Sequence, residues 1–433
     1  MTIVATERLE LNPPALTTWT VIAICWAAIM SEGYDVGVMG AIVPTLLASK
    51  TWDLTPVQVG ALGSYALLGM LFGGLLVGTL SDLYGRKRMF LCCVPLFSLS
   101  MIVAALAPSP TVFALARLIG GLGLGGIIPV AAAYTVEFSP KPKRGFNYGV
   151  MYSGYSLGIL FAALVAIWTI STTGWRGVVA FGALGLVVVP LAAIFLPESI
   201  DSLISRGQFD MARRVAARHG IALPAELSIT RTEQPTVRRI AASILTGRTG
   251  IATILFWIAI ALGLLNVYGL NTWLPQIMRR SGYDLGSSLS FLAVFSLASA
   301  IGGMAIGMMA DVRGKARIVA AAYVLGSLGI AALTFKGTLP VNYALIAVAG
   351  LGSISASLVL TAFIAEYYDP AIRTAATGWA MAAARVGAMS GPLIGGYLAQ
   401  MQVDVAWNFY TFAGMALLAA IAVILVPKNP HVS

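Results

Sequence analysis

Four ionisable side chains lie within long apolar stretches of this sequence: Glu32, Asp35, Arg117 and Arg385. A charged side chain near the centre of a membrane span costs at least about 2.5–3.5 kcal/mol, so such residues are by default functional. Two poorly solvated carboxylates close together cannot both stay ionised cheaply, so one of them can take up a proton near neutral pH. An arginine stays charged and presents a planar fork that matches a carboxylate. These residue types predict a site that exchanges protons and binds an organic anion.

Glu32 and Asp35 are three residues apart, which places them on one face of a helix. Counting ~1.5 Å per residue from a start near residue 17 puts Glu32 some 22 Å along that helix, near the middle of a membrane. The two histidines, His219 and His431, fall outside the apolar stretches, so any proton must be carried by carboxylates. In the alternative reading, Asp35 pairs permanently with an arginine and serves packing.

The two arginines differ in depth. Arg385 lies about 13 residues into its apolar stretch and reaches a depth similar to that of Glu32, so it is the preferred clamp for a substrate carboxylate. Arg117 lies only about seven residues from the opposite end of its stretch. The sequence leaves open whether Arg117 binds the substrate or pairs with Asp35.

Further candidates for the substrate site are amide and aromatic side chains within apolar stretches. Each alone is more often core or lipid-facing than part of a site. Few amides accompany the arginines and carboxylates, which disfavours a sugar site, since sugars want many neutral donors and acceptors. The candidates are Tyr155, Asn266, Tyr268, Asn271, Phe295 and Trp379.

A second set of polar residues recurs at a fixed offset of 229 positions. Four charged matches at one offset are hard to ascribe to chance in a chain with 10% charged residues. Parallel copies of one membrane-embedded unit are typical of transporters whose halves rock around a central site. We therefore interpret the repeated residues as gating elements, by which the chain opens and closes. The matched pairs are Gly78 and Gly307, Asp82 and Asp311, Gly85 and Gly314, Arg88 and Arg317, Glu137 and Glu366, and Arg144 and Arg373.

The four deep ionisable groups have no charged counterpart in this repeat. The residues at the same offset from Glu32 and Asp35 are Ala261 and Leu264. Those that correspond to Arg117 and Arg385 are Ile346 and Ser156. What repeats is expected to gate, and what does not repeat is expected to do the chemistry.

The composition indicates a membrane protein, because 58% of the residues are hydrophobic and only 10% are charged, against about 25% charged in soluble proteins. We expect twelve spans, helical because each helix satisfies its own backbone hydrogen bonds in lipid. The predicted fold is an all-α membrane protein of two pseudosymmetric six-helix bundles, residues 1–196 and 250–433, joined by a linker at 197–249. The predicted spans are 17–47, 57–80, 88–107, 110–136, 145–170, 175–196, 250–278, 286–310, 316–335, 341–365, 372–399 and 404–427.

The net charge of +10 reflects topology rather than a nucleic-acid partner. Most of the lysines and arginines fall on one side of the predicted spans, which puts both termini in the cytoplasm of a multi-pass inner-membrane protein. Residues 1–16 show no cleavable signal peptide. The linker segment 202–219 is expected to be one helix on the membrane surface, either a basic connection or a lipid-contacting element. Neither a metal nor a cofactor is expected, and we predict a monomer.

The run from Gly78 to Arg88 resembles the G-x-x-x-D-x-x-G-R-[RK]-x-[RK] signature of the major facilitator superfamily. Over nearly its whole length, the chain is similar to the aromatic acid/proton symporters of that superfamily. The family's first-helix signature, D-G-x-D, begins here with Glu32, a longer acid that keeps the proton chemistry but changes the reach of the carboxylate. The motifs that carry this resemblance are Glu32–Asp35, Arg117 with Gly121, Gly123 and Gly125, Gly154–Gly158, Trp175–Arg176, Leu196–Ser199, Trp273–Pro275, Arg385–Gly387 and Gly391–Gly396.

The resemblance implies proton-driven uptake of a small aromatic carboxylate, such as benzoate or hydroxybenzoate. It also implies that Asp82, Gly85, Arg86 and Asp311, together with the repeated Glu and Arg pairs, latch and release the cytoplasmic side. Three alternatives stay open: an efflux antiporter, a transporter of sugars or other organic anions, and a membrane sensor that does not transport. An enzyme is not expected, because no nucleophile–base set or nucleotide loop is present.

Overall fold

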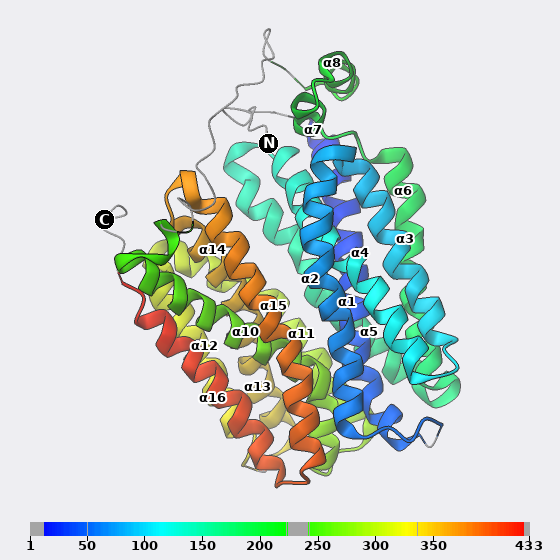
Figure 1. Ribbon diagram of the computed structural model, residues 1–433. Helices are drawn as coiled ribbons and strands as arrows, with labels where there is room; N and C mark the ends of the chain where they lie inside the picture. Colours follow the sequence, from blue (N-terminus) through cyan, green and yellow to red (C-terminus); the bar gives the residue numbers. More distant parts are fainter. Residues whose placement is uncertain are drawn as a thin grey trace. The chain divides into compact units, whose positions relative to one another are not determined.

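The computed structural model describes residues 13–49, 51–221, 223, 241, 243–335 and 337–427. Within these residues, every regular element is helical (Figure 1). Short 3-10 turns cover Lys141–Lys143 and Phe181–Val187, and a π-helical turn covers Leu351–Ser355. The α-helices are α1 (Ala15–Ala48), α2 (Pro56–Tyr84), α3 (Arg86–Ala105), α4 (Pro110–Glu137), α5 (Arg144–Ala180), α6 (Val188–Phe195), α7 (Ile200–Ser205), α8 (Phe209–Arg218), α10 (Gly247–Arg280), α11 (Leu285–Arg313), α12 (Lys315–Ala332), α13 (Leu339–Gly350), α14 (Ala356–Tyr367), α15 (Pro370–Gln400) and α16 (Val405–Ile424).

Ten helical segments of the described chain are long and apolar enough to cross a membrane. One of them, Lys141–Phe195, has 55 residues and would extend roughly 80 Å as a single helix, far more than the ~30 Å of a bilayer core. It therefore holds two of the predicted spans. The helix α15 (31 residues) matches a further predicted span. The protein is thus an all-helical membrane protein with ten to twelve spans, as the composition predicted.

The predicted span at 175–196 is helical but is not one continuous α-helix. Gly174 has φ 63° and ψ −171°, which kinks α5 just before residue 175. After the kink the chain completes α5, passes through the 3-10 turn at Phe181–Val187, and ends in α6, which has only eight residues. The kink falls between the predicted spans 145–170 and 175–196, whereas the 3-10 turn inside the second of them was not predicted.

The structure gives the repeated signature the same turn in both copies. Gly85 ends the α2–α3 connection with φ 98° and ψ 147°, and Gly314 ends the α11–α12 connection with φ 92° and ψ 127°. Backbone with such a positive φ is readily adopted only by glycine. The 229-residue offset therefore marks a repeated turn as well as a repeated sequence.

The described chain forms two compact units. The first draws on residues 1–35, 68–158 and 179–234, and the second on residues 36–67, 159–178 and 235–433. This division passes through α1, α2 and α5. It does not test the predicted division into 1–196 and 250–433, which stays a prediction. In the first unit α3 packs along α4, and in the second α10 packs along α15 and α12 along α16.

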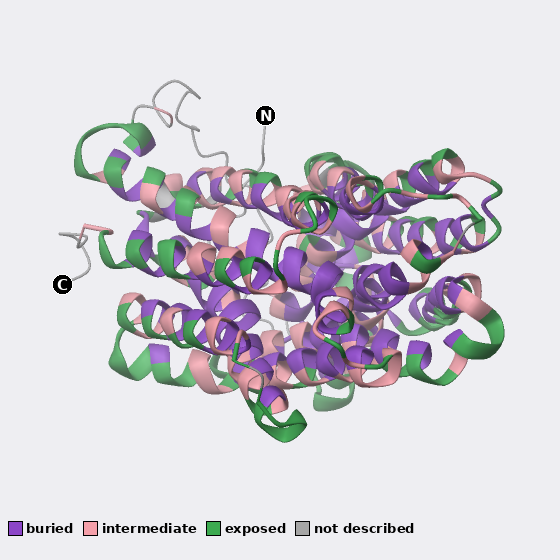
Figure 2. Ribbon diagram, turned by 90° about the horizontal axis from the view of Figure 1, so that it is seen from below, coloured by how far each residue is buried: buried purple, intermediate pink, exposed green. Residues whose placement is uncertain are grey.

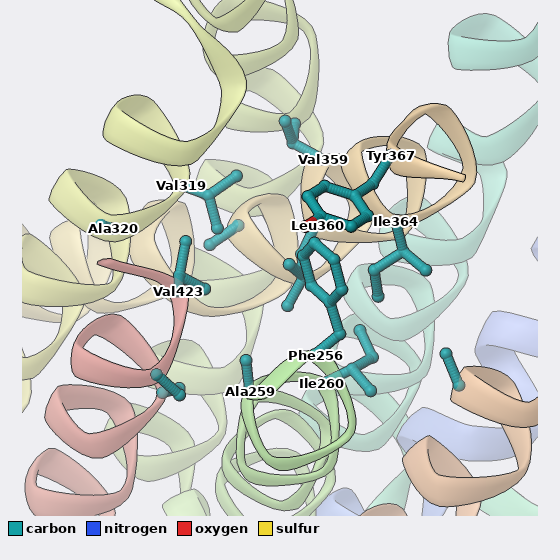
Figure 3. Close-up of a cluster of buried hydrophobic side chains, with 14 of the residues drawn as sticks. Phe256, Ala259, Ile260, Val319, Ala320, Val359, Leu360, Ile364, Tyr367 and Val423 are labelled. Atoms are coloured by element: carbon teal, nitrogen blue, oxygen red, sulfur yellow. The ribbon is translucent and has the colours of Figure 1, made fainter. Parts of the chain in front are cut away.

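An apolar cluster fills the second unit, with side chains from α10, α12, α14 and α16 (Figure 3). Phe256 lies at its centre, in edge contact with Tyr367 at 5.1 Å and with Phe363 at 5.2 Å between ring centroids. Such edge-to-face pairs add about 0.5–1.5 kcal/mol beyond burial.

Buried and exposed residues alternate around each helix, yet the exposed positions include many large apolar side chains (Figure 2). Trp168 is 86% exposed, for example, and Ile194 is 70% exposed. In water such surfaces would favour aggregation. In a bilayer they face hydrocarbon, where helices are stable because all their backbone hydrogen bonds are internal.

The predicted linker helix at 202–219 is wrong as a single helix. It is two helices, α7 and α8, separated at Gly207, whose φ is 73°. Ser199 begins α7, because its hydroxyl oxygen accepts a hydrogen bond from the backbone N–H of Ser202 at 3.1 Å. Both helices belong to the first unit.

Candidate functional site

The carboxylate of Glu32 lies on α1, where this helix packs closely on α5. A Cβ atom at Gly33 would lie 2.0 Å from the carbonyl oxygen of Tyr155, and one at Gly158 would lie 2.1 Å from that of Met30. Only glycine permits these approaches, because the neighbouring atoms are backbone. The side chain of Glu32 is fully buried as a result.

Asp35 and Arg117 form a buried ion pair in the same unit. Arg117 donates through Nη1 to Oδ1 of Asp35 and through Nη2 to its backbone carbonyl oxygen, the latter at 3.2 Å. The Sδ atom of Met101 also lies 3.3 Å from Nη1. Of the two roles left open for Arg117, this structure therefore contains the ion pair. Breaking a buried pair by removing one partner costs about 3–5 kcal/mol.

The ion pair still has unused hydrogen-bonding capacity. Oδ2 of Asp35 and Nε of Arg117 are buried without a hydrogen-bond partner among the described residues. A buried polar atom without a partner is costly, so the pair leaves Oδ2 of Asp35 able to accept one further hydrogen bond.

Three tyrosines line one face of α5 beside this site. Tyr152 stacks on Tyr148 at 6.0 Å and on Tyr155 at 5.8 Å between ring centroids. Tyr148 also interacts electrostatically with Glu32. Tyr155 was predicted from its type, whereas Tyr148 was missed. The i, i+4, i+7 spacing of the three could have revealed it.

The other predicted binding residues belong to the second unit. Arg385 lies on α15 and is partly exposed. On α10, Asn266 donates to the carbonyl of Phe412 at 3.0 Å, and Asn271 donates to that of Val36 at 3.1 Å. The Oδ1 atoms of both asparagines are buried without a hydrogen-bond partner in the described chain. Each amide thus keeps one acceptor oxygen available.

The remaining aromatic candidates are largely covered. Tyr268 is 6% exposed and Phe295 has no exposed surface. Trp379, on α15, is partly exposed and lies 6.3 Å from Trp257 between ring centroids. Their roles in substrate binding stay predictions.

Glu137 is the centre of the repeated charges in the first unit. Its carboxylate accepts from Arg86 and from the hydroxyl of Ser199, each at 2.6 Å. It also accepts from the backbone N–H groups of Ile200 and Asp201, at 2.6 and 3.2 Å. A carboxylate that caps free N–H groups at a helix start is stabilised there, so Glu137 ties the end of α4 to α3 and α7.

The second unit repeats part of this arrangement. Lys315, which corresponds to Arg86 at the 229-residue offset, pairs with Glu366, which corresponds to Glu137. Lys315 also lies 3.6 Å from Asp311. Glu366 is 60% exposed, whereas the side chain of Glu137 is only 1% exposed, so the second copy is the weaker contact.

The repeated arginines also match. Nε of Arg144 donates to the carbonyl of Ser139 at 3.3 Å, and Nε of Arg373 donates to that of Tyr368 at 3.3 Å. Both acceptors are again 229 positions apart. The side chain of Asp82 lies outside the described residues, so its gating role stays a prediction.

The sequence missed several partners of the repeated glutamates. Ser199, Asp201 and Lys315 contact the repeated carboxylates directly or share their ion pairs. Lys315 could have been found as the counterpart of Arg86. A cavity of about 220 Å³ opens beside the network in the first unit, lined by Arg86, Ala132, Ala133, Val136, Glu137, Arg144 and Asp201.

Long apolar helices, a buried acid–base pair and repeated charged turns define a membrane transporter rather than an enzyme. The model of the Major Facilitator Superfamily matches residues 25–354 and 256–433. The chain belongs to this superfamily.

Relatives agree with this assignment, and a solved structure shows a similar fold. The chain is 31% identical to a benzoate transport protein of Acinetobacter baylyi, over 94% of this chain and 89% of that protein. It is 32% identical to a gentisate transporter of Corynebacterium glutamicum, over 93% and 86%. The fold is similar to that of the xylose transporter XylE from E. coli, with a TM-score of 0.77 at 18% identity over 97% of this chain and 100% of that chain.

Proposed function

We propose that the protein imports a small aromatic carboxylate together with protons, by alternating access. The observation that carries this proposal is the buried Asp35–Arg117 pair three residues from the buried carboxylate of Glu32. Such a cluster is costly in a membrane unless it is used. The names of the benzoate and gentisate relatives support an aromatic acid as the cargo.

In the proposed cycle, the substrate carboxylate binds Arg385, whose guanidinium forms two parallel hydrogen bonds to it. Glu32 or Asp35 takes up a proton. The loaded site then holds fewer unpaired charges, because the proton neutralises a carboxylate and the substrate pairs with Arg385, so the desolvation cost that opposes closure around it falls. The carrier can now change the side to which the site is open.

The repeated charges serve this change of state. Arg86–Glu137 and Lys315–Glu366 hold the ends of membrane helices within each unit. In the proposal, Asp82 and Asp311 latch the halves on the cytoplasmic side and release them when the loaded site changes state. Each half can then move as a body because its own ion pairs stay intact.

The energy source follows from the charges moved. One proton per aromatic monoanion is electroneutral and uses only the pH gradient. A second proton would also use the membrane potential, at about 2.3 kcal/mol per charge per 100 mV. Uptake measured with and without a potential at constant pH gradient distinguishes these cases.

The test is uptake of radiolabelled acids into proteoliposomes with and without an inward proton gradient. The panel comprises benzoate, 4-hydroxybenzoate, gentisate and nicotinate, with xylose as the neutral control. We expect gradient-driven accumulation of at least one acid, abolished by a protonophore, and none of xylose. Accumulation of no acid, or export of preloaded acid against an inward proton flow, would contradict import.

A further inference from the structure

The helix α8 presents two different surfaces. Ala212 and Ala216, one turn apart, are 0% and 2% exposed and face the rest of the first unit. Arg213, Arg214 and Arg218 are exposed on the same helix. With α7, this helix lies at the end of the first unit where α6 ends (Figure 1).

A basic group gathers where α8 meets the ends of two membrane helices. Nζ of Lys87, at the start of α3, donates to the carbonyl of Ala193 in the last turn of α6 at 3.0 Å. His219 follows α8, and its pKa is lowered by burial and then by the charges of Arg218 and Lys87. Such mutual effects require the three side chains to lie close together.

The same place borders a lipid-facing surface. Leu191, Ile194 and Phe195 are 43%, 70% and 55% exposed on α6, in and next to the turn that Lys87 contacts. Exposed apolar side chains at the end of a membrane helix contact acyl chains, so the cations beside them stand at the depth of lipid headgroups. A single phospholipid can therefore contact both surfaces.

We propose that Lys87, Arg218 and His219 form a binding site for the phosphodiester headgroup of an anionic phospholipid. Lys87 and Arg218 contact the phosphate, and the acyl chains lie along Ile194 and Phe195. Glu198 interacts electrostatically with Lys87 and offsets part of its charge. A lipid relieves the repulsion between the cations Lys87 and Arg218 and so fixes α8 against the membrane.

The test is native mass spectrometry of the purified full-length protein with phosphatidylglycerol, phosphatidylcholine or inorganic phosphate. We expect one retained phosphatidylglycerol and little phosphatidylcholine. Because each basic residue near an anionic surface contributes about a fivefold change in binding, Lys87→Gln and Arg218→Gln should each reduce retention by about that factor. Glu198→Gln should increase it.

Arg214→Gln is the matched control, since Arg214 has the same charge and exposure on the same helix. An equal loss in Arg214→Gln and Arg218→Gln would mean general attraction and would overturn the site. Retention of inorganic phosphate but not of phosphatidylglycerol would also overturn the proposed site. So would unchanged retention of phosphatidylglycerol in Arg218→Gln. Thermal unfolding in lipid-free detergent identifies a variant that fails to fold, and Arg218→Gln, an exposed change, should match the wild type there.

Discussion

Arg117 donates to both the carboxylate and the backbone carbonyl of Asp35, 82 positions earlier in the chain. The contact joins α4 to α1 in the interior of the first unit. Arg117 thus holds both the side chain and the backbone of Asp35. A change of charge at Asp35 therefore alters the contact between α1 and α4.

Removing Arg117 should destabilise the protein more than removing the whole pair. We expect Arg117→Gln to cost about 3–5 kcal/mol, because it leaves Asp35 charged, buried and uncompensated. Adding Asp35→Asn should recover most of this loss. Thermal unfolding in detergent measures the stability of both variants. A double variant no more stable than Arg117→Gln would show that the lost ion pair does not explain the destabilisation.

Glu32 should set the pH dependence of transport. Glu32→Gln cannot release a proton, so gradient-driven uptake should be lost while exchange of labelled for unlabelled substrate continues. Glu32→Asp keeps an acid and should retain the response to the gradient. Uptake by Glu32→Gln that still follows the proton gradient would place the proton on another residue.

Arg385 should determine affinity for the carboxylate. Arg385→Ala should abolish uptake of any aromatic acid. Arg385→Lys keeps the charge without the planar fork and should bind more weakly, by about tenfold or more. Calorimetric titration of the purified variants separates binding from transport, and wild-type affinity in Arg385→Ala would refute the clamp.

The approach of α1 to α5 should depend on Gly158. Gly158→Ala places a Cβ atom 2.1 Å from the carbonyl oxygen of Met30, and such overpacking costs about 1–3 kcal/mol or more. Gly149→Ala is the matched control on α5, where nothing lies within 4 Å of the added atom. Equal melting temperatures for the two variants would mean that the helices separate freely.

The two copies of the charged turn should differ in strength. Glu137→Gln weakens the pair with Arg86 and the cap of α7, so limited proteolysis after α7 should become faster. Glu366→Gln, the change at the equivalent position, removes the ion pair with Lys315. Because the side chain of Glu366 is 60% exposed, this loss should have little effect on stability. A larger effect at Glu366 would reverse this order.

The sequence by itself determined the class of the protein and the chemistry available to it. Composition made it a membrane protein, since so few charged residues cannot cover a soluble surface. The offset of 229 positions identified the two charged turns, because a duplicated unit keeps the residues that its turn requires, such as Gly85 and Gly314. Glu32, Asp35 and Arg117 stood out because a buried charge is costly, so charged residues are kept within membrane spans only where they serve a function.

Only the tertiary structure decided which of these groups meet. In the sequence, Arg117 lies nearer to the end of its predicted span than Asp35 lies to the end of its own. Close packing of the helices nevertheless brings its guanidinium onto Asp35. The repeat grouped Glu137 with Arg86 and Arg144 without giving its partners, whereas folding of the chain after α6 brings Ser199 and the start of α7 to it, beside Arg86. Helical periodicity gives the face on which a side chain lies, but the partner on the next helix depends on how the helices pack, and that is set by contacts between residues far apart in the chain.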